Sequence, residues 1–138
     1  MKIEWQQDLA TGDEKIDRHH KELLAKVQQL VNACKEGREK TAVLQMLDYL
    51  ANYVDSHFAE EERFLELYRV ANTMQHLKQH ADFRRSLDKL RADCVKEGAS
   101  LAVVTNSLKL TYLWLRDHIQ QMDKTMIQAK LDVVVSRG

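Results

Sequence analysis

Residues 42–68 read AVLQMLDYLANYVDSHFAEEERFLELY, and this stretch decides the fold of the chain. Core-type positions recur along it in alternating steps of four and three, the spacing of a helix that packs within a bundle. The seam comprises Val43, Leu47, Leu50, Val54, His57, Glu61, Phe64 and Tyr68. A histidine and a carboxylate therefore lie in line with the apolar core positions, which predicts a polar site inside a helical core.

Three further stretches show amphipathic helical periodicity. Residues 17–36 carry a stripe that includes His20, and residues 73–96 carry one that includes His76 and His80. The stretch that follows Ser100 carries a stripe that includes His118. The chain contains no proline, which favours long unbroken helices. Four long helices are therefore expected, each with histidine on its packing face.

Short polar residues and glycines mark the expected helix ends. Thr41 and Ser100 are predicted N-caps, and Asn72 with Gln75 resembles a capping box. Gly37 and Gly98 each follow an apolar-periodic segment, where a left-handed terminator is expected. The connections between these ends are short, so consecutive helices must run antiparallel.

These elements predict an all-α protein with an antiparallel up-down four-helix bundle. Residues 1–138 are interpreted as one domain, in which the bundle spans about residues 17–124. An N-terminal arm, residues 1–16, is expected to be anchored against the helices by Trp5, Leu9 and Ile16. A short C-terminal extension, residues 125–138, is expected to continue the last helix and then fray.

Composition narrows the range of functions. The 21 basic and 21 acidic residues give zero formal net charge, which argues against a nucleic-acid or anionic-membrane partner. No apolar run is long enough to cross a bilayer, and residues 1–8 lack the layout of a secretory signal. A cytoplasmic monomer is therefore expected. Cys34 and Cys94 continue apolar stripes and are interpreted as reduced core residues.

Seven potential metal ligands fall into four helical motifs. The motifs are Asp17-x-x-His20, His57-x-x-x-Glu61, His76-x-x-x-His80 and His118-x-x-x-x-Asp123. An antiparallel bundle brings all four motifs to the same end. Any one motif is more often a surface contact or a hydrogen-bonded core histidine, but all four together favour a metal site. The predicted ligands are His20, His57, Glu61, His76, His80, His118 and Asp123.

The last motif has an unusual spacing. His118 and Asp123 lie five residues apart, about 140° around a regular α-helix. They converge only if the helix relaxes locally, and we therefore expect a π-bulge between them. On the first helix, His20 lies within the apolar stripe and His19 near its edge, so His19 is expected at the surface or behind the ligands. Asp17 is interpreted as a first-turn acid that the helix dipole favours.

The ligand types indicate the metal. Buried unpaired carboxylates would be costly, and two cations offset that cost. A set of imidazoles and carboxylates without thiolate suits iron, and manganese or zinc less well. If both carboxylates bridge and one further oxygen bridges, seven protein ligands leave one open position on two octahedral metals. A single vacancy suits a diatomic ligand better than a bulky organic substrate. The neighbouring acids Glu60 and Glu62 are expected to be solvated.

The chain resembles the hemerythrin family, specifically single-domain bacterial hemerythrins, over about residues 3–124. The resemblance rests on Ile16-Asp17-x-x-His20-Lys21-x-Leu23, His57-Phe58-x-x-Glu61-Glu62, His76-x-x-x-His80 and Trp114-Leu115-x-x-His118-x-x-x-x-Asp123, preceded by Trp5, Leu9 and Gly12. In place of the Gly and Pro common between the second and third helices of relatives, this chain has Tyr68-Arg69-Val70-Ala71-Asn72.

The resemblance implies a cofactor of two iron ions (Fe2+/Fe3+) with a bridging oxo or hydroxo group. His76, His80 and His118 would bind one iron, His20 and His57 the O2-binding iron, and Glu61 and Asp123 would bridge them. The implied function is reversible O2 binding for storage, delivery or scavenging, with NO and azide as further small ligands. Residues expected to line the pocket are Phe58, Phe83, Trp114, Leu115 and Met122.

Two other function classes stay open at this point. The same metal pair could serve a redox enzyme, such as a peroxide or nitric-oxide reductase or a ferroxidase. Ferritin-like carboxylate oxidases, however, use mostly glutamate with Glu-x-x-His motifs, whereas this chain offers five histidines and two carboxylates. That composition favours an oxygen-binding protein over an enzyme. The third class is an O2- or redox-sensing module that acts through a separate partner.

Overall fold

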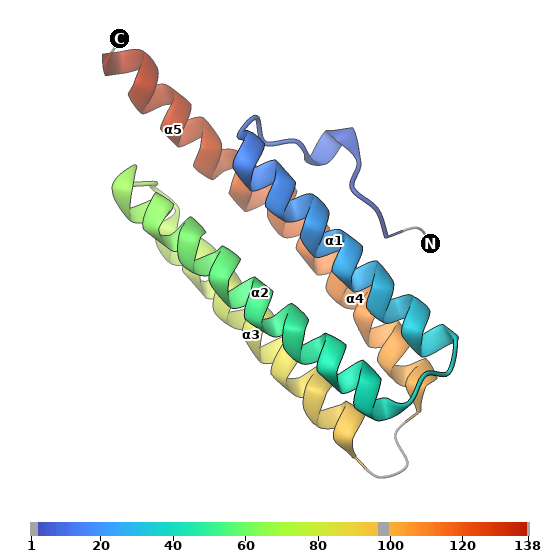
Figure 1. Ribbon diagram of the computed structural model, residues 1–138. Helices are drawn as coiled ribbons and strands as arrows, with labels where there is room; N and C mark the ends of the chain where they lie inside the picture. Colours follow the sequence, from blue (N-terminus) through green and yellow to red (C-terminus); the bar gives the residue numbers. More distant parts are fainter. Residues whose placement is uncertain (1–2, 97–99, 138) are drawn as a thin grey trace.

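The computed structural model describes residues 3–96 and 100–137. In these ranges the chain is helical apart from the arm and the connections (Figure 1). The elements are η1 (Gln7–Leu9), α1 (Glu14–Lys35), α2 (Lys40–Leu67), α3 (Thr73–Val95), α4 (Leu101–His118), η2 (Ile119–Asp123) and α5 (Lys124–Arg137). Within the described residues, no helix is long and apolar enough to cross a membrane.

Helices α1 to α4 form the bundle. Consecutive helices run in opposite directions, and α1 packs on both α2 and α4 while α3 packs on the same two helices (Figure 1). The predicted all-α up-down four-helix bundle is confirmed. Its core is built from the apolar seams and includes Leu24, Leu50, Phe83 and Leu108, all at most 1% exposed. Burial of each such side chain stabilises the fold by about 1.5–3 kcal/mol.

The helix ends agree only partly with expectation. Ser100 caps α4 as predicted, since its side chain accepts a hydrogen bond from the Ala102 amide. Helix α2 instead begins at Lys40 after Glu39, so Thr41 is not its N-cap. Asn72 does occupy the N-cap position of α3, but its side chain makes no capping hydrogen bond. These helices are therefore stabilised mainly by packing of their apolar faces.

Helix α1 starts earlier than predicted. Asp13 caps it by accepting from the Ile16 amide, so the helix begins at Glu14 and the arm ends at residue 13. The Asp17 carboxylate accepts hydrogen bonds from the Thr11 amide and hydroxyl, at 2.8 and 2.7 Å. Asp17 is thus a first-turn acid, as predicted, and it also ties the arm to the helix.

Two connections contain left-handed backbone. Gly37, which ends α1, has φ 72°, as its predicted role as a terminator requires. Arg69 has φ 48° in the turn between α2 and α3, a conformation that costs a non-glycine residue about 1–2 kcal/mol. Gly98, the other predicted terminator, lies outside the described residues.

The arm packs along the side of α1, and helix α5 packs on the end of the bundle through Met126 and Ile127 (Figure 1). Leu9 and Ile16 are buried, and the Trp5 ring packs on the core with Lys21 Nζ 4.4 Å from its centroid. Trp5 and Leu9 thus anchor the arm as predicted, whereas Ile16 lies on α1 and packs with Leu65, Met126 and Ile127. Helix α5 continues the direction of α4 and η2 and projects past the start of α1 (Figure 1). The expected C-terminal extension of the last helix is therefore helical through Arg137.

Candidate metal centre

The seven predicted ligands lie together in the core at one end of the bundle. Helices α1 to α4 and the π-helix η2 each contribute at least one of them. All are at most 3% exposed, and Glu61, His76 and His80 are 0% exposed. Their ligand atoms form two groups in which every atom lies within 4.8 Å of the others. One group is Glu61, His76, His80, His118 and Asp123; the other is His20, His57 and Glu61.

Glu61 joins the two groups. Its Oε2 lies 2.7 Å from His57 Nε2 and 3.4 Å from His20 Nε2. Its Oε1 lies 3.0 Å from His80 Nε2 and 3.3 Å from His76 Nε2. Each carboxylate oxygen therefore faces a different group of imidazoles, the arrangement that a bridging carboxylate needs.

Asp123 spans the same two groups from the opposite side. Its Oδ2 lies 3.1 Å from His20 Nε2, and its Oδ1 lies 3.1 Å from His76 Nε2 and 3.3 Å from His118 Nε2. It reaches this position because Ile119–Asp123 form a π-helix, as predicted from the five-residue spacing. The wider turn brings both members of the motif to the interior, where each is at most 2% exposed.

Charges in the cluster stabilise one another. Burial alone would raise the pKa of Glu61 and Asp123, and the neighbouring carboxylate would raise that of Asp123 further. The charges of His57 on Glu61 and of His118 on Asp123 instead hold both pKa values below the ordinary range. Burial lowers the pKa of His20, but hydrogen bonds to Asp123 and Glu61 raise it to about 10. In the metal-free protein, protonated imidazoles thus balance the charge of the two buried carboxylates, a role that metal cations would take over.

The donor set fits a metal pair. Among the described residues, several buried polar atoms of the cluster have no well-formed hydrogen bond: His20 Nδ1, His57 Nε2, His76 Nδ1, His118 Nε2 and Asp123 Oδ1. Three of them, His57 Nε2, His118 Nε2 and Asp123 Oδ1, face an oppositely charged group of the cluster without the geometry of a hydrogen bond. Cations between the imidazoles and the two carboxylates would satisfy the inward-facing atoms. The absence of thiolate in either group suits iron better than a structural zinc site.

A second layer of polar side chains contacts the outer ring nitrogens. Glu62 Oε2 lies 2.9 Å from His80 Nδ1, and Gln79 Oε1 lies 2.7 Å from His118 Nδ1. His19 Nδ1 lies 3.2 Å from His57 Nδ1, so His19 stands behind a predicted ligand. Sequence reasoning missed Glu62 and Gln79, and the expectation that Glu62 is simply solvated is wrong. Glu62 follows Glu61 on α2, and its side chain is directed toward α3. The spacing of residues within α2 gives no indication of this contact with another helix.

Aromatic rings cover one side of the cluster. Phe58 stacks on His80 with centroids 3.8 Å apart, and Trp114 stacks on His118 at 5.0 Å. Phe83 in turn stacks on Trp114 at 4.7 Å. These rings lie mainly against the three-histidine group, and Phe58 also lies 6.2 Å from the His57 ring. Leu115 and Met122 are also buried, at 1% and 5% exposure.

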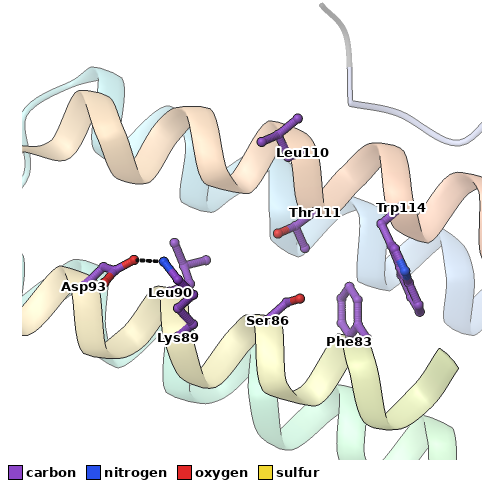
Figure 2. Close-up of a pocket in the computed structure, with 8 residues that line it drawn as sticks. All are labelled: Phe83, Ser86, Lys89, Leu90, Asp93, Leu110, Thr111 and Trp114. Carbon is purple, nitrogen blue, oxygen red and sulfur yellow. Dashed lines mark hydrogen bonds and ion pairs between the residues drawn. The ribbon is translucent and has the colours of Figure 1, made fainter. Parts of the chain in front are cut away.

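A groove of about 280 Å³ runs between α3 and α4 next to this aromatic wall. Figure 2 shows Phe83 and Trp114 side by side at one end of the groove and Leu90 and Leu110 further along it. None of the seven predicted ligands lines the groove. Since the Trp114 ring stacks on His118, it lies between the groove and that histidine. The groove is therefore separate from the metal centre.

Both cysteines lie in the core, away from the two groups of ligands. Cys34 and Cys94 are free thiols with 5% and 0% exposure, as their place in the apolar stripes predicted. Burial raises the pKa of the Cys34 thiol. A thiol with a raised pKa is a poor nucleophile and a poor metal ligand at neutral pH.

The charge arrangement predicts how the metal-free protein responds to pH. Burial lowers the pKa of His118, but the Asp123 charge raises it to about 9, while that of His20 is about 10. In the unfolded chain both titrate near 6.5. Their stabilising contribution is therefore complete below pH 6.5 and is lost as pH rises toward 10. Denaturant unfolding with a chelator present should show a falling free energy of unfolding over this range.

The metal-loaded protein is the control for this experiment. Imidazoles that bind metal are already neutral, so its free energy of unfolding should fall much less between pH 6.5 and 10. A flat profile for the metal-free protein would contradict the assigned ion pairs.

Fold and donor set together define a class: a four-helix-bundle protein with a candidate two-metal centre in its core. Comparison with known proteins agrees with that class. Residues 11–129 match the family model described as the hemerythrin HHE cation binding domain. The chain is 32% identical to a bacteriohemerythrin of Pseudomonas aeruginosa over 125 residues, which are 91% of this chain and 79% of the relative.

More distant relatives include a myohemerythrin of Theromyzon tessulatum. It is 26% identical over 122 residues, which cover 87% of each chain. A bacteriohemerythrin of Stenotrophomonas maltophilia is 25% identical over 120 residues, 87% of this chain and 76% of the relative. The protein belongs to the hemerythrin family.

Proposed function

We propose that this protein binds O2 reversibly at a pair of non-heme iron ions in the bundle core. The observation that carries the proposal is the pair of buried donor groups that share Glu61 and are both contacted by Asp123. The family match and the bacteriohemerythrin and myohemerythrin relatives support the same function. Residues 1–138 are proposed to act as one domain, with the arm and α5 as parts of it.

Each predicted ligand has a proposed role. His76, His80 and His118 would hold one iron, and His20 and His57 would hold the other. Glu61 and Asp123 would bridge the two, together with an oxo or hydroxo group. This division follows the two groups of ligand atoms and the way the carboxylate oxygens face them. The two-histidine iron would keep the open position, since it has one imidazole fewer.

The bound iron pair would supply an open coordination position and two electrons. The chain's own part is to keep the donors apart from water. His20 and His57 are 1% and 3% exposed, and Leu115 and Ile119 are buried in the adjoining core. A diatomic molecule can reach such a site through small packing fluctuations, whereas an organic substrate cannot. A role in lining the ligand pocket stays a proposal for Phe58, Phe83, Trp114, Leu115 and Met122.

The composition of the donor set favours binding over turnover. It holds five imidazoles and two carboxylates, whereas ferritin-like carboxylate oxidases use mostly glutamate. We therefore propose an oxygen-binding protein, active as a monomer in the cytoplasm, that also accepts NO or azide. Its role as store, carrier, scavenger or sensor depends on O2 affinity and on partners.

The test is anaerobic loading with ferrous iron, followed by O2 and then by purging with argon. We expect two irons per chain and a visible charge-transfer band that forms with O2 and fades on purging. Rapid irreversible conversion to a diferric product would favour the redox enzyme or the redox sensor. Absence of iron uptake would overturn the metal centre itself.

A further inference from the structure

Three of the inward-facing histidines have a polar partner on their outer side. His57, His80 and His118 direct Nε2 toward the carboxylates and Nδ1 toward His19, Glu62 and Gln79. If Nε2 binds metal, the ring proton must be on Nδ1. Each outer partner must then accept a hydrogen bond from that proton.

The outer partners differ between the two groups of ligands. His80, in the three-histidine group, faces the Glu62 carboxylate at 2.9 Å. His57, in the two-histidine group, faces the His19 imidazole at 3.2 Å, and this imidazole can accept only while Nδ1 is unprotonated. The nearest carboxylate on this side, Glu60, lies behind His19, 3.7 Å from its Nδ1, and does not contact His57 directly. A carboxylate acceptor makes the ligating imidazole more basic than a neutral acceptor does. The Glu62 charge therefore raises the metal affinity of the three-histidine group more than the neutral His19 imidazole raises that of the two-histidine group.

Both partners are held in place by their own contacts. The His19 ring is 20% exposed and lies edge-on to His57 and Tyr53, with centroids 5.3 and 6.4 Å away. Glu62 also contacts Arg84 Nη1 at 3.4 Å, and the same guanidinium donates to Asp55 at 2.9 Å. These contacts restrict both side chains to positions from which they can accept from the ligands.

We propose that His19 and Glu62 are positioning residues that each serve one metal position. Glu62 orients His80 and strengthens the three-histidine position, whereas His19 orients His57 and supports the weaker two-histidine position. Metal consequently enters the three-histidine position first. This inference rests on the proposed metal centre, and it adds an order of loading and two residues outside the ligand set.

Cobalt(II) titration of the metal-free protein tests the proposal without relying on O2 binding. Calorimetry should resolve two binding steps, and proton NMR should show hyperfine-shifted, exchangeable imidazole N–H signals. Three such signals after the first step would place the first ion among His76, His80 and His118. Two signals would place it between His20 and His57 and would overturn the order of loading.

Single variants separate the two roles. Glu62→Gln should weaken the first binding step about 10–100-fold and leave the second step unchanged. His19→Leu should weaken the second step by a similar factor and leave the first step unchanged. His19→Gln keeps an acceptor and should restore the second step. Glu66→Gln, an exposed change on the same helix, is the matched control and should alter neither step.

The outcomes distinguish this inference from the proposed function. No cobalt bound by the parent protein would count against the metal centre. Two ions bound by the parent but an unchanged second step in His19→Leu would overturn the positioning role of His19. An unchanged first step in Glu62→Gln would overturn that of Glu62. Circular dichroism equal to the parent's would show that a weakened step is not due to unfolding, and His19→Gln tests the same position with little change in polarity.

Discussion

Glu61→Gln is expected to eliminate binding of the iron pair and with it the reversible O2 band. The two oxygens of Glu61 lie within 3.4 Å of four imidazole nitrogens, and both groups of ligand atoms depend on them. An amide cannot bridge two cations as a carboxylate does. In the metal-free protein the change also removes a buried counter-charge, so unfolding should become easier by about 3–5 kcal/mol. Iron per chain and denaturant unfolding measure the two effects.

Glu66→Gln is the matched control, because Glu66 lies on the same helix and is exposed. It should leave iron content, the O2 band and the free energy of unfolding close to those of the parent. Retention of both irons and of the O2 band by Glu61→Gln would show that Glu61 is not the bridge between the two groups of ligands.

Much of the fold was predictable because packing and metal binding use the same helical periodicity. His57 and Glu61 continue the seam of α2 that begins with Val43, and both prove to be buried. Short connections then forced antiparallel neighbours, which brought His20 and His118 to the same end of the bundle. The π-helix before Asp123 followed from one spacing that a regular helix could not accommodate.

The errors concern features that depend on tertiary contacts. Thr41 has the chemistry of an N-cap, yet α2 begins before it, at Lys40, and Glu39 at the N-cap position makes no side-chain capping hydrogen bond. Glu62 looks like a solvated acid on its own helix, and only the approach of α3 places His80 beside it. Spacing within one helix specifies which face a side chain occupies, but it does not specify the neighbouring side chain.

The π-helix leads to a second prediction with a large expected effect. Insertion of one alanine after Gln121 should eliminate the iron pair, because it turns the aspartate by a further 100° or so relative to His118. Deletion of Gln121 should instead retain both irons. The two ligands are then four residues apart, and a regular α-helix places such residues on one face. Gln121 is exposed, so its side chain contributes little to the core.

The pair of variants discriminates because both change the chain length by one residue at the same exposed position, Gln121. Disruption of the helix as such would reduce iron binding in both. If the π-helix serves to orient Asp123, iron binding should be lost only on insertion. Deletion of one residue converts the wide turn to a regular α-helical turn, and Asp123 and α5 then keep their orientation about the helix axis. Iron content and helical circular dichroism of the two proteins provide the measurement. Loss of iron on deletion together with its retention on insertion would mean that the wide turn does not aim Asp123 at the centre.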